Sequence, residues 1–207
     1  MTTENPKNGL HTEYYDNGQK KAEGDYKDNK KEGKWTEWHE NGKKHIVEKY
    51  KDGIKHGKST RWHDNGKKLI VSKYKDGKLD GKWTWWDENG QKWREINNKD
   101  GNWNGKVTSW NDNGQKEHEM SYKDGIKHGK WTRWHENGKK WFEQNYKDGT
   151  AHGKKIVWYE NGQKWYERNY KDGEYDGKLT EWYVNGQIES VSYWKDNECI
   201  SGDCPDD

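Results

Sequence analysis

The chain of 207 residues is 26% hydrophobic and 37% charged, a composition that usually leaves a chain disordered because too little apolar surface can be buried. Its 16 Trp and 13 Tyr argue against disorder, since disordered segments are poor in aromatic residues. The 39 Lys and Arg nearly balance the 37 Asp and Glu, and both signs are spread along the chain, which argues against a nucleic-acid partner.

Residues 1–8 form a polar N-terminal segment. This segment contains no apolar stretch, so it predicts neither a signal peptide nor a transmembrane span. We therefore expect a cytoplasmic protein, or an exported one if a leader precedes the given sequence.

An internal repeat begins directly after this segment. Asn-Gly recurs in steps of 24 residues, with its Asn at 17, 41, 65, 89, 113, 137, 161 and 185. Lys-Asp recurs in the same steps, with its Lys at 27, 51, 75, 99, 123, 147, 171 and 195. The sequence therefore predicts eight tandem 24-residue repeats over residues 9–200, followed by an acidic C-terminal tail at 201–207.

Each repeat has the pattern of a β-hairpin. Asn-Gly between two β-prone runs predicts a two-residue type I′ turn, in which both residues take a positive φ. The Lys-Asp-Gly segment predicts a second turn that leads to the next hairpin. The predicted fold is all-β, an elongated single antiparallel sheet that is expected to twist and to curve, because sheets beyond about ten strands seldom stay flat.

These residues resemble the MORN repeat, and more closely its bacterial variant. Residues 75–92 carry the resemblance, reading Lys-Asp-Gly-Lys-Leu-Asp-Gly-Lys-Trp-Thr-Trp-Trp-Asp-Glu-Asn-Gly-Gln-Lys. The resemblance implies a hairpin array without catalytic residues. It also implies an antitoxin or immunity-like role, as similar bacterial proteins are labelled, or the membrane, phosphoinositide and dimer contacts of eukaryotic MORN arrays.

Alternation along a strand predicts which residues share a face of the sheet. The uniform face collects the positions five, three and one residues before each Asn and those two, four and six residues after it. The position five residues before the Asn is here called the Thr row, and the position three residues before it the Trp row. The Trp row predicts the main packing layer of the sheet. It contains Tyr14, Trp38, Trp62, Trp86, Trp110, Trp134, Trp158 and Trp182.

The opposite face, here called the variable face, differs from repeat to repeat. Its positions lie six, four and two residues before each Asn and five and seven residues after it. Repeats need the same packing residues in every copy, so variation indicates either a recognition surface or drift. The mixture of aromatic and Arg side chains is typical of interface hot spots. The candidate partner-binding residues are His39, His63, Trp85, Arg94, Arg133, His135, Phe142 and Tyr166.

These rows admit other interpretations. The Trp row could stack on sugar rings or nucleic-acid bases, or it could be core. Equivalent His residues in adjacent hairpins lie roughly 9–10 Å apart, too far to share one metal ion. Most of the His, Glu and Lys residues belong to rows that recur along the repeats, whereas an enzyme needs one asymmetric group of catalytic residues. We therefore expect no enzymatic activity, no cofactor and no metal.

Cys199 and Cys204 admit two interpretations, a pair of surface thiols or a small local disulfide in an exported protein.

Three functional hypotheses remain. The first is a non-catalytic scaffold that binds a protein partner on the variable face. The second is a binder of glycans or phospholipid headgroups at a membrane surface, through an aromatic-rich face. The third is a structural spacer. Unpaired strands at the ends of the sheet could also join two copies of the chain into a homo-oligomer.

Overall fold

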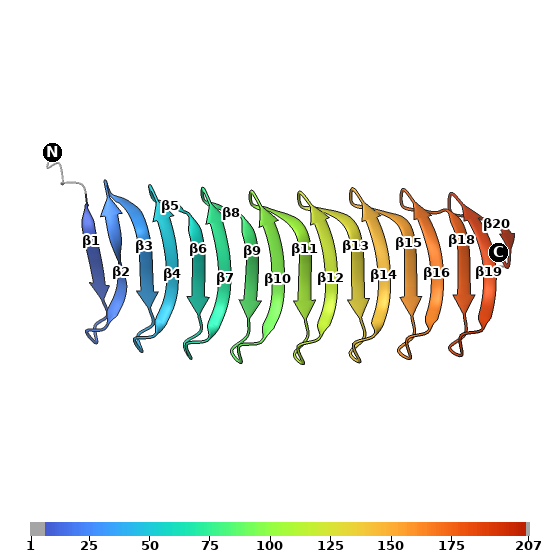
Figure 1. The fold of residues 1–207 in the computed structure, drawn as a ribbon, viewed down its shortest axis with the longest axis horizontal. Coiled ribbons are helices and arrows are strands. Elements are labelled where there is room, and N and C mark those ends of the chain that lie inside the picture. Colours follow the sequence, from blue (N-terminus) through green and yellow to red (C-terminus); the bar gives the residue numbers. More distant parts are fainter. Residues whose placement is uncertain (1–6, 206–207) are drawn as a thin grey trace. The chain divides into compact units, whose positions relative to one another are not determined.

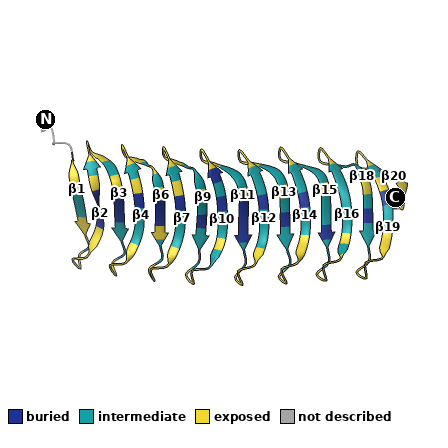
Figure 2. Cartoon of the chain, viewed as in Figure 1, coloured by how far each residue is buried: buried dark blue, intermediate teal, exposed yellow. Residues whose placement is uncertain are grey.

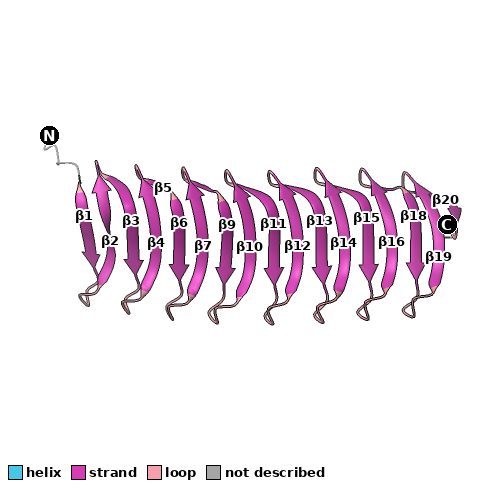
Figure 3. Cartoon of the chain, viewed as in Figure 1, coloured by secondary structure: helices cyan, strands magenta, loops and turns pink. Residues whose placement is uncertain are grey.

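The computed structural model describes residues 7–205. Within that range the chain forms twenty β-strands and no helix (Figure 3). The predicted all-β fold of antiparallel hairpins is confirmed. Residues 1–6 of the predicted N-terminal segment and residues 206–207 of the predicted acidic tail lie outside the described range.

The strands fall into two compact units that divide between Asn102 and Trp103. In each unit the strands pair in antiparallel fashion, mostly with their neighbours along the chain (Figure 1). The N-terminal unit contains β1 (Gly9–Tyr14), β2 (Lys20–Lys27), β3 (Lys30–Trp38), β4 (Lys44–Lys51), β5 (Ile54–Lys55), β6 (Gly57–Trp62), β7 (Lys68–Lys75), β8 (Lys78–Leu79), β9 (Gly81–Trp86) and β10 (Lys92–Lys99). The C-terminal unit contains β11 (Asn102–Trp110), β12 (Lys116–Lys123), β13 (Ile126–Trp134), β14 (Lys140–Lys147), β15 (Thr150–Trp158), β16 (Lys164–Lys171), β17 (Glu174–Tyr175), β18 (Gly177–Trp182), β19 (Ile188–Lys195) and β20 (Glu198–Gly202). The short strands β5, β8 and β17 each pair with the strand before them, which also pairs with the strand after them.

The two-residue type I′ turn occurs at the Lys-Asp segments and not at Asn-Gly. Asp52 and Gly53 both have a positive φ, 52° and 81°, and Lys51 pairs with Ile54 across them. At the Asn-Gly turn only the glycine does, with Gly42 at 79°. The predicted type I′ geometry at Asn-Gly is therefore wrong.

The Asn-Gly turn is longer than predicted. The Gly42 N–H donates to the His39 carbonyl at 2.9 Å, and the His39 N–H donates to the Lys43 carbonyl at 2.9 Å. This pattern is a type I turn that ends in a left-handed glycine bulge. Gly is needed there for its positive φ.

The turn Asn has a different role from the predicted one. The Asn41 Oδ1 accepts from the Lys43 N–H at 3.0 Å, and its Nδ2 donates to the Asp64 carbonyl of the next hairpin at 3.1 Å. The same inter-hairpin bond is made by Asn17, Asn65, Asn137 and Asn161. In these five hairpins the Asn side chain thus ties the turn to the following one.

One extra residue restores the register beyond the longer turn. Trp38 pairs with Lys44 and Glu37 pairs with Ile46, so His45 is left without a residue opposite it. We call this position the bulge row. It comprises Lys21, His45, Leu69, Trp93, Glu117, Trp141, Trp165 and Glu189.

Burial is concentrated in a stripe across the middle of the strands (Figure 2). On the uniform face the stripe is the Thr row, which is 6–7% exposed from Thr36 to Thr180 wherever a Thr occurs. On the variable face it includes Trp35, Ile96, Val107 and Met120, each at most 4% exposed. The core is therefore one side chain deep on either face of the sheet.

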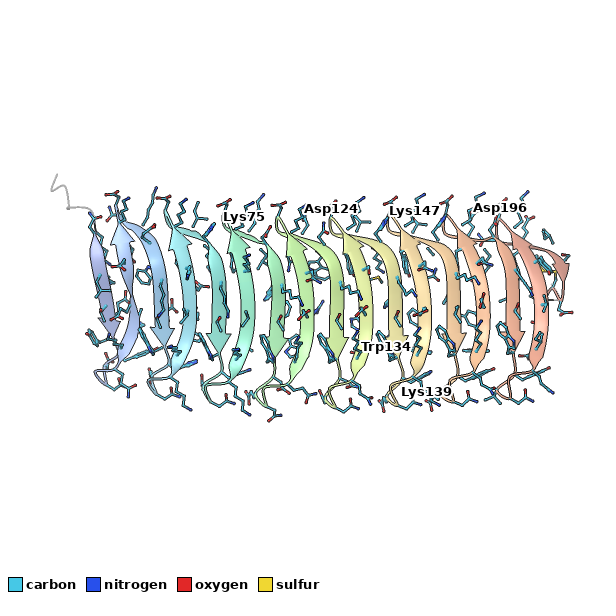
Figure 4. All side chains as sticks on the ribbon, viewed as in Figure 1. Lys75, Asp124, Trp134, Lys139, Lys147 and Asp196 are labelled. Carbon is cyan, nitrogen blue, oxygen red and sulfur yellow. A yellow bond between two sulfur atoms is a disulfide. The ribbon has the colours of Figure 1, made fainter. Side chains whose placement is uncertain are left out.

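The Trp row is not the main packing layer that the sequence predicted. Tyr14 is 60% exposed, and the Trp residues of the row are only half-buried. The row lies beside the Asn-Gly turns, at the edge of the buried stripe, as Trp134 shows (Figure 4). Lysines cover some of the rings, such as Lys140, whose Nζ lies 5.5 Å from the Trp158 ring centroid.

Cys199 and Cys204 form a disulfide, the second of the two interpretations.

Trp35 explains a glycine in the neighbouring strand. A Cβ on Gly24 would lie 2.4 Å from the Trp35 ring, which is 4% exposed. We expect Gly24→Ala to lower the free energy of unfolding by about 1–3 kcal/mol, because the ring must shift in a packed site. Urea unfolding measures the change. In a Trp35→Ser background, which copies Ser59 of the next repeat, the cost should nearly vanish. An equal cost in both backgrounds would contradict this packing.

Candidate interaction surface

The bulge row joins the variable face, where the sequence prediction had not placed it. The Trp141 ring lies 6.0 Å from the His135 ring, and the Trp93 ring lies 6.0 Å from the Trp85 ring. His135 and Trp85 both belong to the variable face. The prediction placed the row on the uniform face because it assumed a two-residue turn.

The variable face therefore has two parts. Its mid-strand positions are buried, and its positions next to the Asn-Gly turns are partly open. In the C-terminal unit we call the open part the turn-proximal patch. It consists of Glu117, Arg133, His135, Trp141, Tyr159 and Trp165.

Arg133 organises one half of the patch. Its guanidinium carbon lies 4.7 Å from the centre of the Trp141 ring, and its Nη2 lies 3.5 Å from the Glu117 Oε1. His135 is held from the other side, since its Nε2 lies 3.1 Å from the Trp158 carbonyl oxygen. These contacts fix Trp141 while leaving it 38% exposed.

Tyr159 and Trp165 form the other half. Their rings are nearly parallel, with centroids 5.7 Å apart and an interplanar angle of 28°. The Tyr159 hydroxyl donates to the Trp182 carbonyl at 3.0 Å, which fixes the ring, and Trp165 is 45% exposed. Two exposed indoles thus occupy the same position of adjacent hairpins.

An open groove of about 990 Å³ lies beside Trp141. Arg133, His135 and Trp134 line it together with the carboxylates of Glu117, Glu136 and Glu160. The groove combines aromatic surface with mostly negative charge. A highly anionic partner such as nucleic acid is disfavoured there.

Of the candidate residues in the N-terminal unit, the two histidines have structural contacts. His39 Nε2 lies 3.2 Å from the Trp62 carbonyl oxygen, and His63 Nε2 lies 3.1 Å from the Trp86 carbonyl oxygen. His39 Nδ1 also lies 3.0 Å from an Asp64 carboxylate oxygen. These bonds join neighbouring hairpins, as those of His135 and Tyr159 do.

Trp85 and Arg94 lie opposite each other in the hairpin of β9 and β10. The Trp85 ring packs on Trp83, with centroids 4.1 Å apart, and reaches toward Trp93, which is 42% exposed. These residues form a second, smaller aromatic cluster in the N-terminal unit.

Phe142 and Tyr166 lie at the border of the buried stripe. The Phe142 ring meets Trp131 edge to face at 4.7 Å, and the Arg168 guanidinium covers the Tyr166 ring at 4.6 Å. Arg133, His135, Phe142 and Tyr166 thus lie in the C-terminal unit, where Arg133 is paired with Phe142, whereas His39, His63, Trp85 and Arg94 lie in the N-terminal unit. Trp141, Trp165 and Glu117 were missed, although the bulge row's unusual Trp content was visible in the sequence.

The hairpin repeats match a known repeat family in sequence. Seven segments match the MORN repeat variant and together cover more than half of the chain. The chain belongs to the MORN repeat family. The matching segments are 7–28, 31–52, 55–76, 79–100, 103–124, 127–148 and 151–172. The eighth hairpin, β18 with β19, lies outside these segments but has the same register, with Gly177 opposite Trp194.

MORN repeats generally serve as non-catalytic scaffolds that bind proteins or membranes. No curated protein matches the chain. Over residues 7–205, no group of three or more His, Cys, Asp or Glu side chains is placed to hold a metal ion. Nor does that part of the chain contain a helix long and apolar enough to cross a membrane.

The uniform face of this MORN array carries a repeated ion network. Glu119 accepts hydrogen bonds from Lys106 at 2.7 Å and from Lys116 at 2.8 Å. Burial acts to raise the pKa of Glu119, but the bonds from the two lysines outweigh it and hold the pKa below its ordinary value. Glu95, Glu143 and Glu167 have the same arrangement and the same direction of shift.

This network predicts an acid-sensitive contribution to stability. A carboxylate whose pKa is lower in the folded chain stabilises it above the unfolded pKa, and that stability is lost as pH falls through the folded pKa. We expect Glu119→Gln to lower the free energy of unfolding by about 0.2–1 kcal/mol at pH 6 and by almost nothing at pH 3. These two pH values lie about one to two units above and below the ordinary pKa of Glu.

Urea unfolding at both pH values measures the difference. Glu136→Gln, in an Asn-Gly turn, is the matched control. A cost for Glu119→Gln that is the same at both pH values would contradict the ion network.

Proposed function

We propose that this MORN array is a non-catalytic scaffold that binds a protein partner through the turn-proximal patch of its C-terminal unit. The observation that carries the proposal is the pair of exposed indoles, Trp141 and Trp165, packed against Arg133 and Tyr159 beside an open groove. Trp, Tyr and Arg are the residues that dominate interface hot spots.

The rigidity of the patch supports the same proposal. Side chains that are already fixed lose little conformational freedom when a partner binds. Trp141 is held by Arg133, and Trp165 by Tyr159, whose hydroxyl is itself bonded to backbone. The patch therefore presents large apolar area at a small entropic cost.

The family supports the class of activity, since MORN repeats generally bind proteins or membranes. The patch favours a protein over an anionic lipid surface. Its groove contains Glu117, Glu136 and Glu160 against Arg133 and His135, and anionic headgroups are attracted by clusters of Lys and Arg.

The binding test uses a partner captured from the native host and identified by mass spectrometry. We expect Trp141→Ala, Arg133→Ala, Trp165→Ala and Phe142→Ala each to weaken binding by about 1–3 kcal/mol in isothermal titration. Trp85→Ala and Arg94→Ala report on the second cluster. All variants are first checked for folding by circular dichroism.

Matched controls lie in the Asn-Gly turns, away from the rings. Gln91→Ala, Gln115→Ala and Gln163→Ala should leave binding unchanged. Losses confined to this Gln set, or spread evenly over both sets, would show that the patch is not the binding surface.

Glycan binding is the second candidate, and the parallel Tyr159 and Trp165 rings favour it, since sugars stack on such aromatic platforms. A glycan array with the folded protein tests it. Binding that is lost in Trp165→Ala and retained in Gln163→Ala, without any protein partner, would replace the proposal above.

A further inference from the structure

The C-terminal residues begin a ninth repeat and then depart from it. The Asp196-Asn197 turn has two positive φ values, 49° and 68°, and Lys195 pairs with Glu198 across it, as in the interior turns. At the interior junction between β14 and β15, Gln144 pairs with Lys155, and a wide bulge separates this pair from the pairs next to the turn. At the C-terminal junction between β19 and β20, Ser192 is the residue equivalent to Gln144. It pairs with Gly202, and the bulge that separates this pair from those next to the turn is smaller.

This change of register lets the tail close the edge of β19. The Asp203 N–H donates to the Val191 carbonyl at 2.9 Å, and the Asp203 Oδ2 accepts from the Val191 N–H at 2.9 Å. In interior junctions the residues equivalent to Val191 pair with the Thr row of the next hairpin, as Val47 does with Thr60. Asp203 thus takes the place of a Thr from a following repeat.

The tail is fixed in that place by two further features. Gly202 has a φ of 86°, and a Cβ there would lie 2.3 Å from the Val191 carbonyl oxygen, so only glycine fits. The Cys199–Cys204 disulfide closes the loop on either side of Gly202.

Near the last Asn-Gly turn, the groups that would bond to a following hairpin are turned elsewhere or exposed. Asn185 Nδ2 donates to its own repeat, to Gln187 Oε1 at 3.3 Å. In the previous repeat Asn161 Nδ2 donates forward, to the Val184 carbonyl at 2.9 Å. Tyr183 is 49% exposed, whereas Tyr159 donates to the next hairpin.

The N-terminal end has the form of an interior hairpin. The Asn29 N–H donates to the Lys7 carbonyl at 3.1 Å, as the Gly53 N–H donates to the Lys31 carbonyl at 2.9 Å. Within residues 7–205, β1 pairs only with β2. Thr12 of β1 belongs to the Thr row, whose backbone N–H and C=O point toward the preceding hairpin at interior junctions.

We propose that the tail caps the edge of β19, and that this edge, once uncapped, pairs with β1 of a second copy of this chain. In the register of the interior junctions, Val191 of one copy pairs with Thr12 of the other, and Ser190 pairs with Glu13. Tyr183 and Asn185 then donate to the carbonyls of Tyr14 and Asp16, as Tyr159 and Asn161 do to Trp182 and Val184. Such a head-to-tail contact joins unlike surfaces and does not close by twofold symmetry. The cap keeps the chains apart. This inference is independent of the proposed partner site.

The test compares self-association by sedimentation velocity over a range of protein concentrations. The opened form is the full-length chain with Cys199→Ser, Gly202→Val and Cys204→Ser, in which Val clashes with the Val191 backbone. We expect it to associate at concentrations about tenfold or more below those of the disulfide-bonded wild type. Equal behaviour of the two proteins would overturn the proposal.

A second substitution tests the other edge. Thr12→Pro in the opened form removes the outward N–H of β1 and should abolish the association, whereas Thr12→Val retains that N–H and should leave it in place. Association that survives Thr12→Pro would overturn the proposal, because the contact would then not use β1.

A reductant provides the same comparison without substitutions. Dithiothreitol reduces the disulfide by giving up two electrons and two protons, so that Cys199 and Cys204 become thiols and the reagent forms its own cyclic disulfide. Reduced wild type should associate, and reduced Thr12→Pro should stay monomeric. Reduced wild type that stays monomeric, or reduced Thr12→Pro that associates, would again overturn the proposal.

Discussion

Which side chains lie on each face of this protein depends on one extra residue in each hairpin, the bulge that follows the Asn-Gly turn. A type I turn with a left-handed glycine is one residue longer than the type I′ turn that Asn-Gly suggests. Without compensation, the longer turn would move every later side chain to the opposite face. The bulge row absorbs the extra residue, so Glu37 still lies opposite Ile46. The bulge residue itself is redirected, and it brings Trp141 beside Arg133 and His135.

Hydrogen bonds within the sheet help to keep so polar a chain folded. The buried stripe contains Thr and Ser beside a few apolar residues, and several of its polar side chains have partners within the sheet. The Ser192 hydroxyl accepts from Trp194 Nε1 at 2.8 Å, and Gln144 donates to a backbone carbonyl at 2.9 Å. Glu48, 6% exposed, is bonded to Lys55, Tyr50 and Ser59. Asn, His and Tyr side chains also tie several hairpins to the following one, as Asn41 and His39 do. Ordered hydrogen bonds, repeated in each hairpin, supplement a thin core.

Much of this fold follows from the sequence alone. The 24-residue spacing of Asn-Gly and Lys-Asp predicts antiparallel hairpins, and the pairing of Thr36 with Val47 agrees with the expected register. The turn types could not be predicted, because Asn-Gly and Asp-Gly fit the same type I′ geometry. The choice depends on contacts between hairpins, such as the Asn41 bond to Asp64, which no short stretch of sequence contains. The faces near the turns depended on that choice, so Trp141 and Trp165 were placed with the Trp row. Arg133 and Phe142 could be placed on the variable face without knowing the turn type, because Arg133 lies before the bulge and Phe142 lies beyond it.

The assignment of side chains to the two faces therefore depends on the position of the Trp141 ring. Two-dimensional NMR of the folded protein, with assigned Trp and Arg side chains, tests that position directly. At 4.7 Å from the ring centre, the guanidinium end of Arg133 should show nuclear Overhauser contacts with the indole of Trp141 and upfield ring-current shifts. Contacts from Trp141 to Trp134 on the uniform face, with none to Arg133, would show that the bulge does not redirect the side chain and that the two faces are wrongly assigned.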